Sequence, residues 1–90
     1  MRSESVEIFS DTTNAAIMRH PGRRFPGVLI QGDTLYALCS RVDSLCNEIG
    51  KTSKGYKEAN EIRNELWEYL NQYKNVLIEH KIQLPFSDRP

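Results

Sequence analysis

The chain has 90 residues, and its 12 lysines and arginines balance 12 aspartates and glutamates, so the formal net charge is zero. A neutral chain has no overall field that would recruit nucleic acid or an anionic membrane. Hydrophobic residues make up 39% of the sequence, which is typical of a globular protein and excludes a disordered one. The length predicts one domain, residues 1–90.

No apolar run approaches the roughly 20 residues that a membrane-spanning helix needs. The runs at 28–30 and 76–78, for example, have three residues each. The first residues also lack the apolar stretch of a secretory signal. We therefore expect a cytoplasmic protein without membrane attachment.

The first half has the pattern of a small sheet. Residues 5–9 alternate apolar and polar side chains, which is typical of a half-buried strand, and residues 15–19 form a second short strand. Two prolines and two glycines within 21–27 exclude a helix and a central strand there. Residues 28–31 form a third strand, which ends at Gly32.

The second half changes to the spacing of helices. Asp33 is an expected N-cap, and Gly50 is an expected C-terminal stop for the helix between them. Its apolar stripe recurs at 3–4 spacing and consists of Leu35, Leu38, Val42, Leu45 and Ile49. After a polar connection at 51–55, a second helix is predicted from about residue 56 to about residue 81. Its stripe consists of Ala59, Ile62, Leu66, Tyr69, Leu70, Tyr73 and Leu77.

These elements predict an α+β fold, in which a small three-stranded antiparallel sheet is followed by a two-helix antiparallel hairpin packed on one face of the sheet. The sheet portion is residues 1–32, the hairpin is 33–82, and the tail is 83–90. Pro85 ends any helix, so Leu84 and Phe86 are expected to fold back as a hydrophobic tail. The small size and the exposed sheet edges are compatible with a homodimer.

The two cysteines are expected to be reduced and shielded. Cys39 and Cys46 are seven residues apart on one predicted helix, so their Cα atoms lie roughly 10 Å apart. A disulfide needs less than about 7 Å. The thiols are expected on the flank of the apolar stripe, as packing groups rather than nucleophiles.

Residues 19–25, from the end of the second strand into the loop before the third, hold the only charged side chains between residues 12 and 32, which are three arginines. We take the ligand- or partner-binding residues of this segment to be Arg19, His20, Arg23, Arg24 and Phe25. Guanidinium groups suit phosphate or carboxylate, and an aromatic ring can stack on a base. The alternative is that the arginines pair with glutamates of the helices while Phe25 fills the core.

The Gln31-Gly32-Asp33 sequence opens the first helix. Asp33 is interpreted as the N-cap. In the alternative, Gly32 lets an anion approach the helix N-terminus, although the Asp33 carboxylate would already occupy the free N–H groups.

The run RHPGRRFPGVLIQGD at residues 19–33 resembles a family of short, mostly bacterial proteins of unknown function. The Val6-Glu7-Ile8-Phe9 start and the helical second half fit the same family, so the resemblance covers most of the chain. It implies no activity, because none is assigned to the family.

The second predicted helix offers a partner surface. Its acidic ridge recurs at 3–4–3 spacing and consists of Glu58, Glu61, Glu65 and Glu68. Trp67 lies off the apolar stripe, and tryptophan is enriched in interface hot spots. The alternatives are a solvated acidic face and a tryptophan covered by the sheet or the tail.

The sequence has no catalytic motif and no histidine–cysteine spacing that suits a metal, so we expect no catalytic residue, metal or cofactor. The leading hypothesis is a non-enzymatic protein–protein interaction module, of the immunity type that neutralises a toxin. The alternative is a small module that binds a phosphate-bearing ligand or nucleic acid through residues 19–25. The first hypothesis requires a protein partner, which the sequence does not identify.

Overall fold

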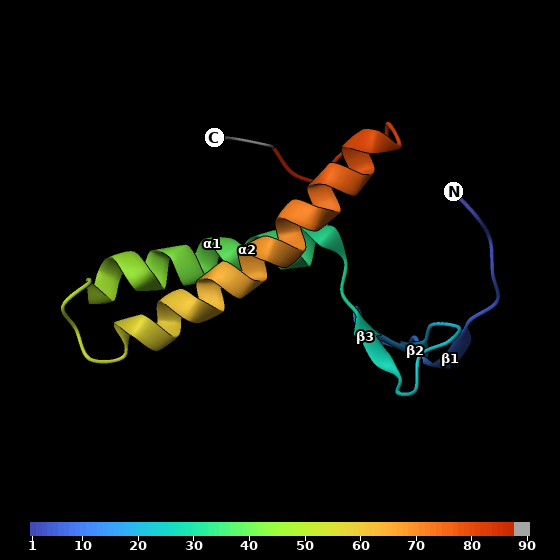
Figure 1. The fold of residues 1–90 in the computed structure, drawn as a ribbon, viewed down its shortest axis with the longest axis horizontal. Helices are drawn as coiled ribbons and strands as arrows, with labels where there is room; N and C mark the ends of the chain where they lie inside the picture. The colour runs from blue at the N-terminus through green and yellow to red at the C-terminus, as the bar shows by residue number, and fades with distance from the viewer. Residues whose placement is uncertain (88–90) are drawn as a thin grey trace. The chain divides into compact units, whose positions relative to one another are not determined.

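The computed structural model describes residues 1–87, and the chain divides into two compact units (Figure 1). The sheet unit ends at Gln31 and the hairpin unit begins at Gly32, one residue before the predicted boundary. Each unit is described by itself, and the packing of the hairpin on the sheet stays a prediction. Residues 88–90 of the expected tail lie outside the described residues.

The sheet unit is the predicted antiparallel sheet, with the strand order β1-β2-β3. The strands are β1 (Glu7–Ser10), β2 (Ala16–Arg19) and β3 (Gly27–Leu29). Met18 is the central register position, because it pairs with Ile8 on β1 and with Gly27 on β3. A bulge interrupts the β1–β2 register between Ile8 and Ser10.

The expected half-burial of the first strand is wrong. Ile8 is 57% exposed and Phe9 is 56% exposed, and no residue from 1 to 31 is buried. Apolar side chains stand at successive positions here, so both faces of the sheet carry them, and three short strands cannot cover both faces.

The hairpin unit consists of α1 (Gly32–Ile49) and α2 (Tyr56–Glu79), which pack against each other. This confirms the predicted pair of helices. Gly50 has a φ of 75° and Gly55 has a φ of 89°. Glycine adopts this left-handed conformation at little cost, which explains why the chain turns between these two positions.

The first helix begins at Gly32, two residues before the start that an N-cap at Asp33 predicts. Asp33 therefore lies in the first turn instead of preceding it, and its Oδ1 accepts the Thr34 N–H at 2.8 Å. Gly32 is buried against the ring of Tyr73, and a Cβ atom at Gly32 would overlap that ring. Gly32 therefore makes room for the Tyr73 ring. In the alternative given above, it would instead make room for an anion at the helix N-terminus.

The apolar faces of both helices are rotated from the predicted stripes. Cys39, Cys46 and Leu70 are at most 2% exposed and form what we call the cysteine seam. The cysteines thus occupy the centre of the interface instead of its flank. Small thiol side chains allow the two helices to approach closely there. The structure confirms that both cysteines are free and buried.

The C-terminal end of α2 closes with backbone hydrogen bonds from two residues beyond it. Ile82 N–H bonds the carbonyl of Leu77 at 2.8 Å, and Lys81 N–H bonds the carbonyl of Ile78 at 3.1 Å. This is the Schellman pattern, with Lys81 at a φ of 59° in the position that usually holds glycine. The helix ends at Glu79, two residues before the predicted end.

The tail folds back as predicted. The Phe86 ring stacks on the Tyr36 ring of α1, with 4.4 Å between centroids and 9° between the planes. It also lies 6.5 Å from the Tyr73 ring of α2, so it touches both helices. Neither helix of residues 1–87 has the length and apolar character needed to cross a membrane.

Candidate functional site

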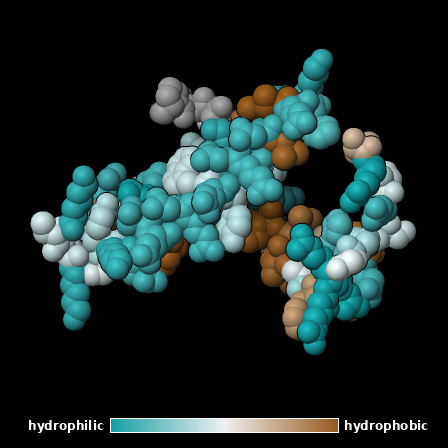
Figure 2. Space-filling view, in the orientation of Figure 1, coloured by the Kyte–Doolittle hydropathy of each residue, from teal (hydrophilic) through white to brown (hydrophobic). Residues whose placement is uncertain are grey.

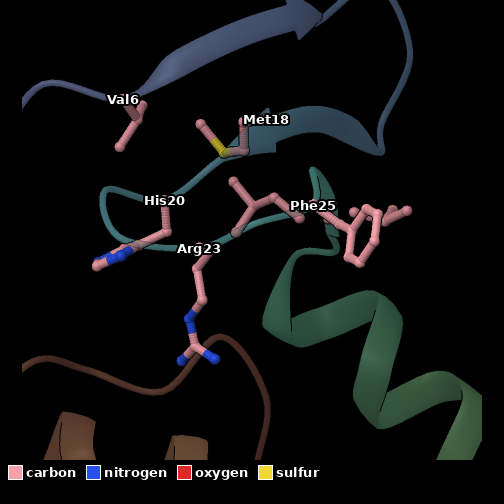
Figure 3. Close-up of a pocket in the computed structure, with 8 residues that line it drawn as sticks. Val6, Met18, His20, Arg23 and Phe25 are labelled. Atoms are coloured by element: carbon pink, nitrogen blue, oxygen red, sulfur yellow. The ribbon is translucent and has the colours of Figure 1, made fainter.

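The sheet unit carries a hollow of about 360 Å³, which we call the sheet hollow (Figure 3). Most of its wall is apolar, with one guanidinium group and one imidazole ring from the loop. The lining residues are Val6, Met18, His20, Arg23, Phe25, Gly27, Val28 and Leu29.

The hollow exists because a glycine stands opposite the central residue of the sheet. Met18 pairs with Gly27 across β2 and β3, and glycine has no side chain to cover the methionine. Val6 lies two residues before Ile8, the partner of Met18 on β1, so Val6 and Met18 share a face. Figure 3 shows these two side chains together at one side of the hollow.

A tight turn brings the two polar lining residues to the hollow. The Arg23 N–H bonds the carbonyl of His20 at 3.0 Å, which closes a four-residue turn. Pro21 is its second residue, and Gly22, with a φ of 82°, is its third, which are the residue preferences of a type II turn. His20 and Arg23 therefore stand at the two ends of the turn, and the imidazole Nδ1 donates to the Pro21 carbonyl at 2.8 Å.

The structure separates the three arginines of the loop. Arg19 forms two hydrogen bonds of 2.9 Å to the carboxylate of Glu7, its register partner on β1. These bonds lower the pKa of the Glu7 carboxyl and raise the pKa of the Arg19 guanidinium. Arg24 lies over the Phe25 ring, 5.3 Å from its centroid.

Arg23 is thus the arginine that lines the hollow. No carboxylate of residues 1–31 forms an ion pair with it. Figure 3 shows its side chain between those of His20 and Phe25. Phe25 is 72% exposed and does not fill a core. Of the five residues predicted for this site, the structure brings His20, Arg23 and Phe25 together.

Sequence reasoning missed the apolar wall of the hollow, which is Val6, Met18, Val28 and Leu29. The signal was the glycine at position 27, because a glycine inside a strand leaves open space beside its neighbours. The composition of residues 21–27 predicts Gly27 only as part of the loop.

The second predicted surface lies on α2, where Glu58, Glu61, Glu65 and Glu68 are all exposed. Trp67 is half-buried, and its Nε1–H donates to the Asp43 carboxylate of α1 at 3.0 Å. This bond holds the indole beside the cysteine seam. The role of Trp67 as a partner residue stays a prediction.

Within residues 1–87, no three or more His, Cys, Asp or Glu side chains are grouped so that they could hold a metal ion. Burial raises the pKa of the Cys39 thiol, and the Asp43 carboxylate raises it further. The thiol is therefore held in its protonated form, which is a poor nucleophile.

The fold and the hollow define a small α+β protein with an apolar surface depression that has a cationic rim. The model of DUF6959, a family of unknown function, matches residues 1–86, so the chain belongs to this family. The resemblance noted at residues 19–33 is confirmed at the level of the family. No curated protein and no solved structure matches the chain.

Proposed function

We propose that the protein is a non-enzymatic protein-binding module and that the sheet hollow receives an apolar side chain of its partner. The observation that carries the proposal is the exposure of the sheet unit. Within the unit itself nothing covers its apolar side chains, although a three-stranded sheet needs a covered apolar face to be stable. Four of the apolar side chains on its strands are at least half exposed: Ile8, Phe9, Val28 and Leu29. Figure 2 shows the resulting hydrophobic surface over β3.

The chemistry of the hollow indicates which side chains fit it. Its apolar wall suits an aliphatic or aromatic residue, and the guanidinium of Arg23 suits a carboxylate next to that residue. The Phe25 ring adds an exposed aromatic contact of the kind that is enriched in interfaces. We therefore expect the partner to present an apolar residue beside an aspartate or glutamate.

The lining favours binding over catalysis. Its side chains include no hydroxyl, thiol, amine or carboxylate. A nucleophile next to a base is the usual requirement for covalent catalysis. A secreted toxin is one class of partner that such a module neutralises, and the immunity-type function stays a prediction from the sequence.

The alternative is a phosphate-bearing ligand or nucleic acid. Arg23 supports it, since a single exposed guanidinium also suits phosphate. The separation of the arginines weighs against it, because Glu7 holds Arg19 and the Phe25 ring faces Arg24. A site with one cation and an apolar wall fits a peptide better than a polyanion.

The test uses photocrosslinking in the native host cells. A benzoylphenylalanine at position 25 is expected to trap a partner, whereas the same group at Gln72, an exposed position of α2, traps a different set or nothing. The trapped protein is then purified, and its affinity is measured by calorimetry. Phe25→Ala and Arg23→Ala are each expected to weaken it about tenfold or more.

Two results would refute the proposal. One is a purified partner that binds both variants as tightly as the wild-type protein. The other is Arg23-dependent binding of inorganic phosphate or a single-stranded oligonucleotide, without a protein trapped at position 25, which would establish the alternative function. The melting temperatures of both variants are measured alongside, to show that they remain folded.

A further inference from the structure

We propose that the hairpin unit carries a second, separate binding surface, which takes a basic amphipathic helix of a partner protein. The surface lies on the side of the hairpin that the bond between Trp67 and Asp43 does not occupy. It goes beyond the function proposed for the sheet hollow, because none of its residues belongs to the sheet unit.

The position of this side follows from the helical geometry. Asp43 and Trp67 lie on the same side of the cysteine seam, because their side chains bond each other across the two helices. At about 100° per residue, Val42 lies on the other side of the seam from Asp43. Leu66 likewise lies on the other side from Trp67. Val42 and Leu66 therefore face the same way, on the side of the hairpin opposite the bond between Asp43 and Trp67.

This side carries an apolar surface that we call the hairpin strip. Its residues follow each other at spacings of three and four on each helix, and they are Leu38, Val42, Leu45, Ile62, Leu66 and Tyr69. Leu45 is 47% exposed, Ile62 is 46% exposed and Tyr69 is 54% exposed. Along α1 the strip borders a hollow of about 520 Å³, to which Arg41 and Glu48 also contribute.

The shape of the strip suits a helix. Two packed helices leave a groove between them, and the side chains of a third helix fit such a groove. Within residues 1–87, the cysteine seam supplies the only fully buried hydrophobic side chains of the hairpin. Within the hairpin unit taken by itself, a third helix on the strip would complete a three-helix arrangement.

The charges beside the strip indicate that the partner helix is basic. Glu58 precedes Ile62 by four residues, and Glu65 precedes Tyr69 by four residues, so both carboxylates border the strip. The Tyr69 hydroxyl donates to Glu65 at 3.2 Å. Charge complementarity then favours lysines or arginines on the partner.

The same charges disfavour a second copy of the chain as the occupant. The α1 border of the strip carries Glu48 beside Arg41, and its α2 border is acidic. Suppose that the strips of two copies faced each other with α2 opposite α2. The carboxylates of Glu58 and Glu65 would then face those of the second copy. With α1 opposite α2, they would meet a border that carries both Glu48 and Arg41, whose opposite charges offer no net attraction. Like charges at an interface oppose binding.

The experiment uses a designed probe, a synthetic helix of about 18 residues with leucines on one face and flanking lysines. A matched peptide carries glutamates in place of the lysines. Fluorescence anisotropy is expected to show salt-sensitive binding of the lysine peptide to the full-length protein, and about tenfold or more weaker binding of the glutamate peptide. Ile62→Ser and Leu45→Ser are each expected to weaken binding of the lysine peptide about tenfold.

Ile78→Ser is the matched control, because Ile78 is a 57% exposed isoleucine of the same helix on the opposite side. It is expected to leave the affinity unchanged. Glu65→Lys changes a surface charge without removing an apolar side chain of the strip. It therefore keeps the test valid where a serine variant unfolds. This charge reversal is expected to weaken the binding of the lysine peptide and to strengthen the binding of the glutamate peptide.

Equal affinity for the two peptides would overturn the proposal, as would an Ile78→Ser effect as large as that of Ile62→Ser. A wild-type dimer in sedimentation experiments that Ile62→Ser dissociates would show that a second copy covers the strip, and the proposal would fail. A failure of this kind would not touch the sheet hollow, whose test uses residues of the other unit.

Discussion

Replacing Gly32 by alanine is expected to destabilise the hairpin, although alanine favours helices more than glycine does. The added Cβ would overlap the Tyr73 ring, which must move and disturb its contact with Phe86. Overpacking of this kind costs about 1–3 kcal/mol, whereas the gain in helix propensity is at most about 1 kcal/mol. The net loss of up to about 2 kcal/mol would lower the melting temperature by up to roughly 15 °C in a domain of this size.

Urea unfolding followed by circular dichroism at 222 nm measures this change. Gly27→Ala is the control, because a Cβ atom there meets nothing within 4 Å, and its effect should stay within about 0.5 kcal/mol. In a Tyr73→Leu background the penalty of Gly32→Ala should fall by about 1 kcal/mol or more. A stabilising Gly32→Ala substitution, or a double-mutant cycle without coupling, would show that the close contact does not shape the start of α1.

Substitutions at two positions and one change of pH further test the hairpin. Lys81→Gly is expected to stabilise the protein by about 1 kcal/mol, because a non-glycine residue with a φ of 59° is strained; an unchanged melting temperature would contradict this. Asp43→Ala leaves the Trp67 N–H without its acceptor and is expected to cost about 1–3 kcal/mol in urea unfolding, whereas Asp43→Asn keeps an acceptor and should cost less. The folded chain holds the Cys39 proton more tightly than the unfolded chain, so stability should decline as the pH rises above the ordinary thiol value of about 9.0; a Cys39→Ala variant should lose that part of the decline.

The order of the elements could be predicted because local chemistry determines it. The change from alternating to helical spacing near Asp33 separates the strands from the helices, and Gly50 and Gly55 have the left-handed backbone that ends one helix and precedes the next. Phe86 after Pro85 could be expected to fold back, since a proline stops the helix and a large apolar ring avoids water.

The rotation of the helices about their axes could not be predicted from apolar spacing alone. Trp67 and Asp43 bond across the helices, so a polar pair occupies part of the interface that the stripe reserved for apolar residues. The large side chains of Ile62 and Tyr69 drew the predicted stripe toward a side that is open in the structure. Hydrophobic spacing finds an amphipathic helix, but it does not distinguish a face buried within the chain from a face available to a partner.

The candidate site was predicted in part for a similar reason. The charged loop could be recognised because Arg23 and Arg24 stand alone among uncharged neighbours. The pairing of Arg19 with Glu7 depends on the strand register, which a bulge displaces and which the sequence does not state. The wall of the hollow likewise depends on Met18 standing opposite Gly27.

The stacking of Phe86 has a consequence for how the hairpin opens. The ring contacts Tyr36, near the start of α1, and Tyr73, near the end of α2, so it ties together the two helix ends that the connecting loop does not join. Fraying of either end must first release the ring, and amide hydrogens in both ends should therefore exchange with solvent as one cooperative group. A chain truncated after Leu84 would lose this coupling, and exchange would accelerate together at residues far apart in sequence while the amides around Cys46 keep their protection.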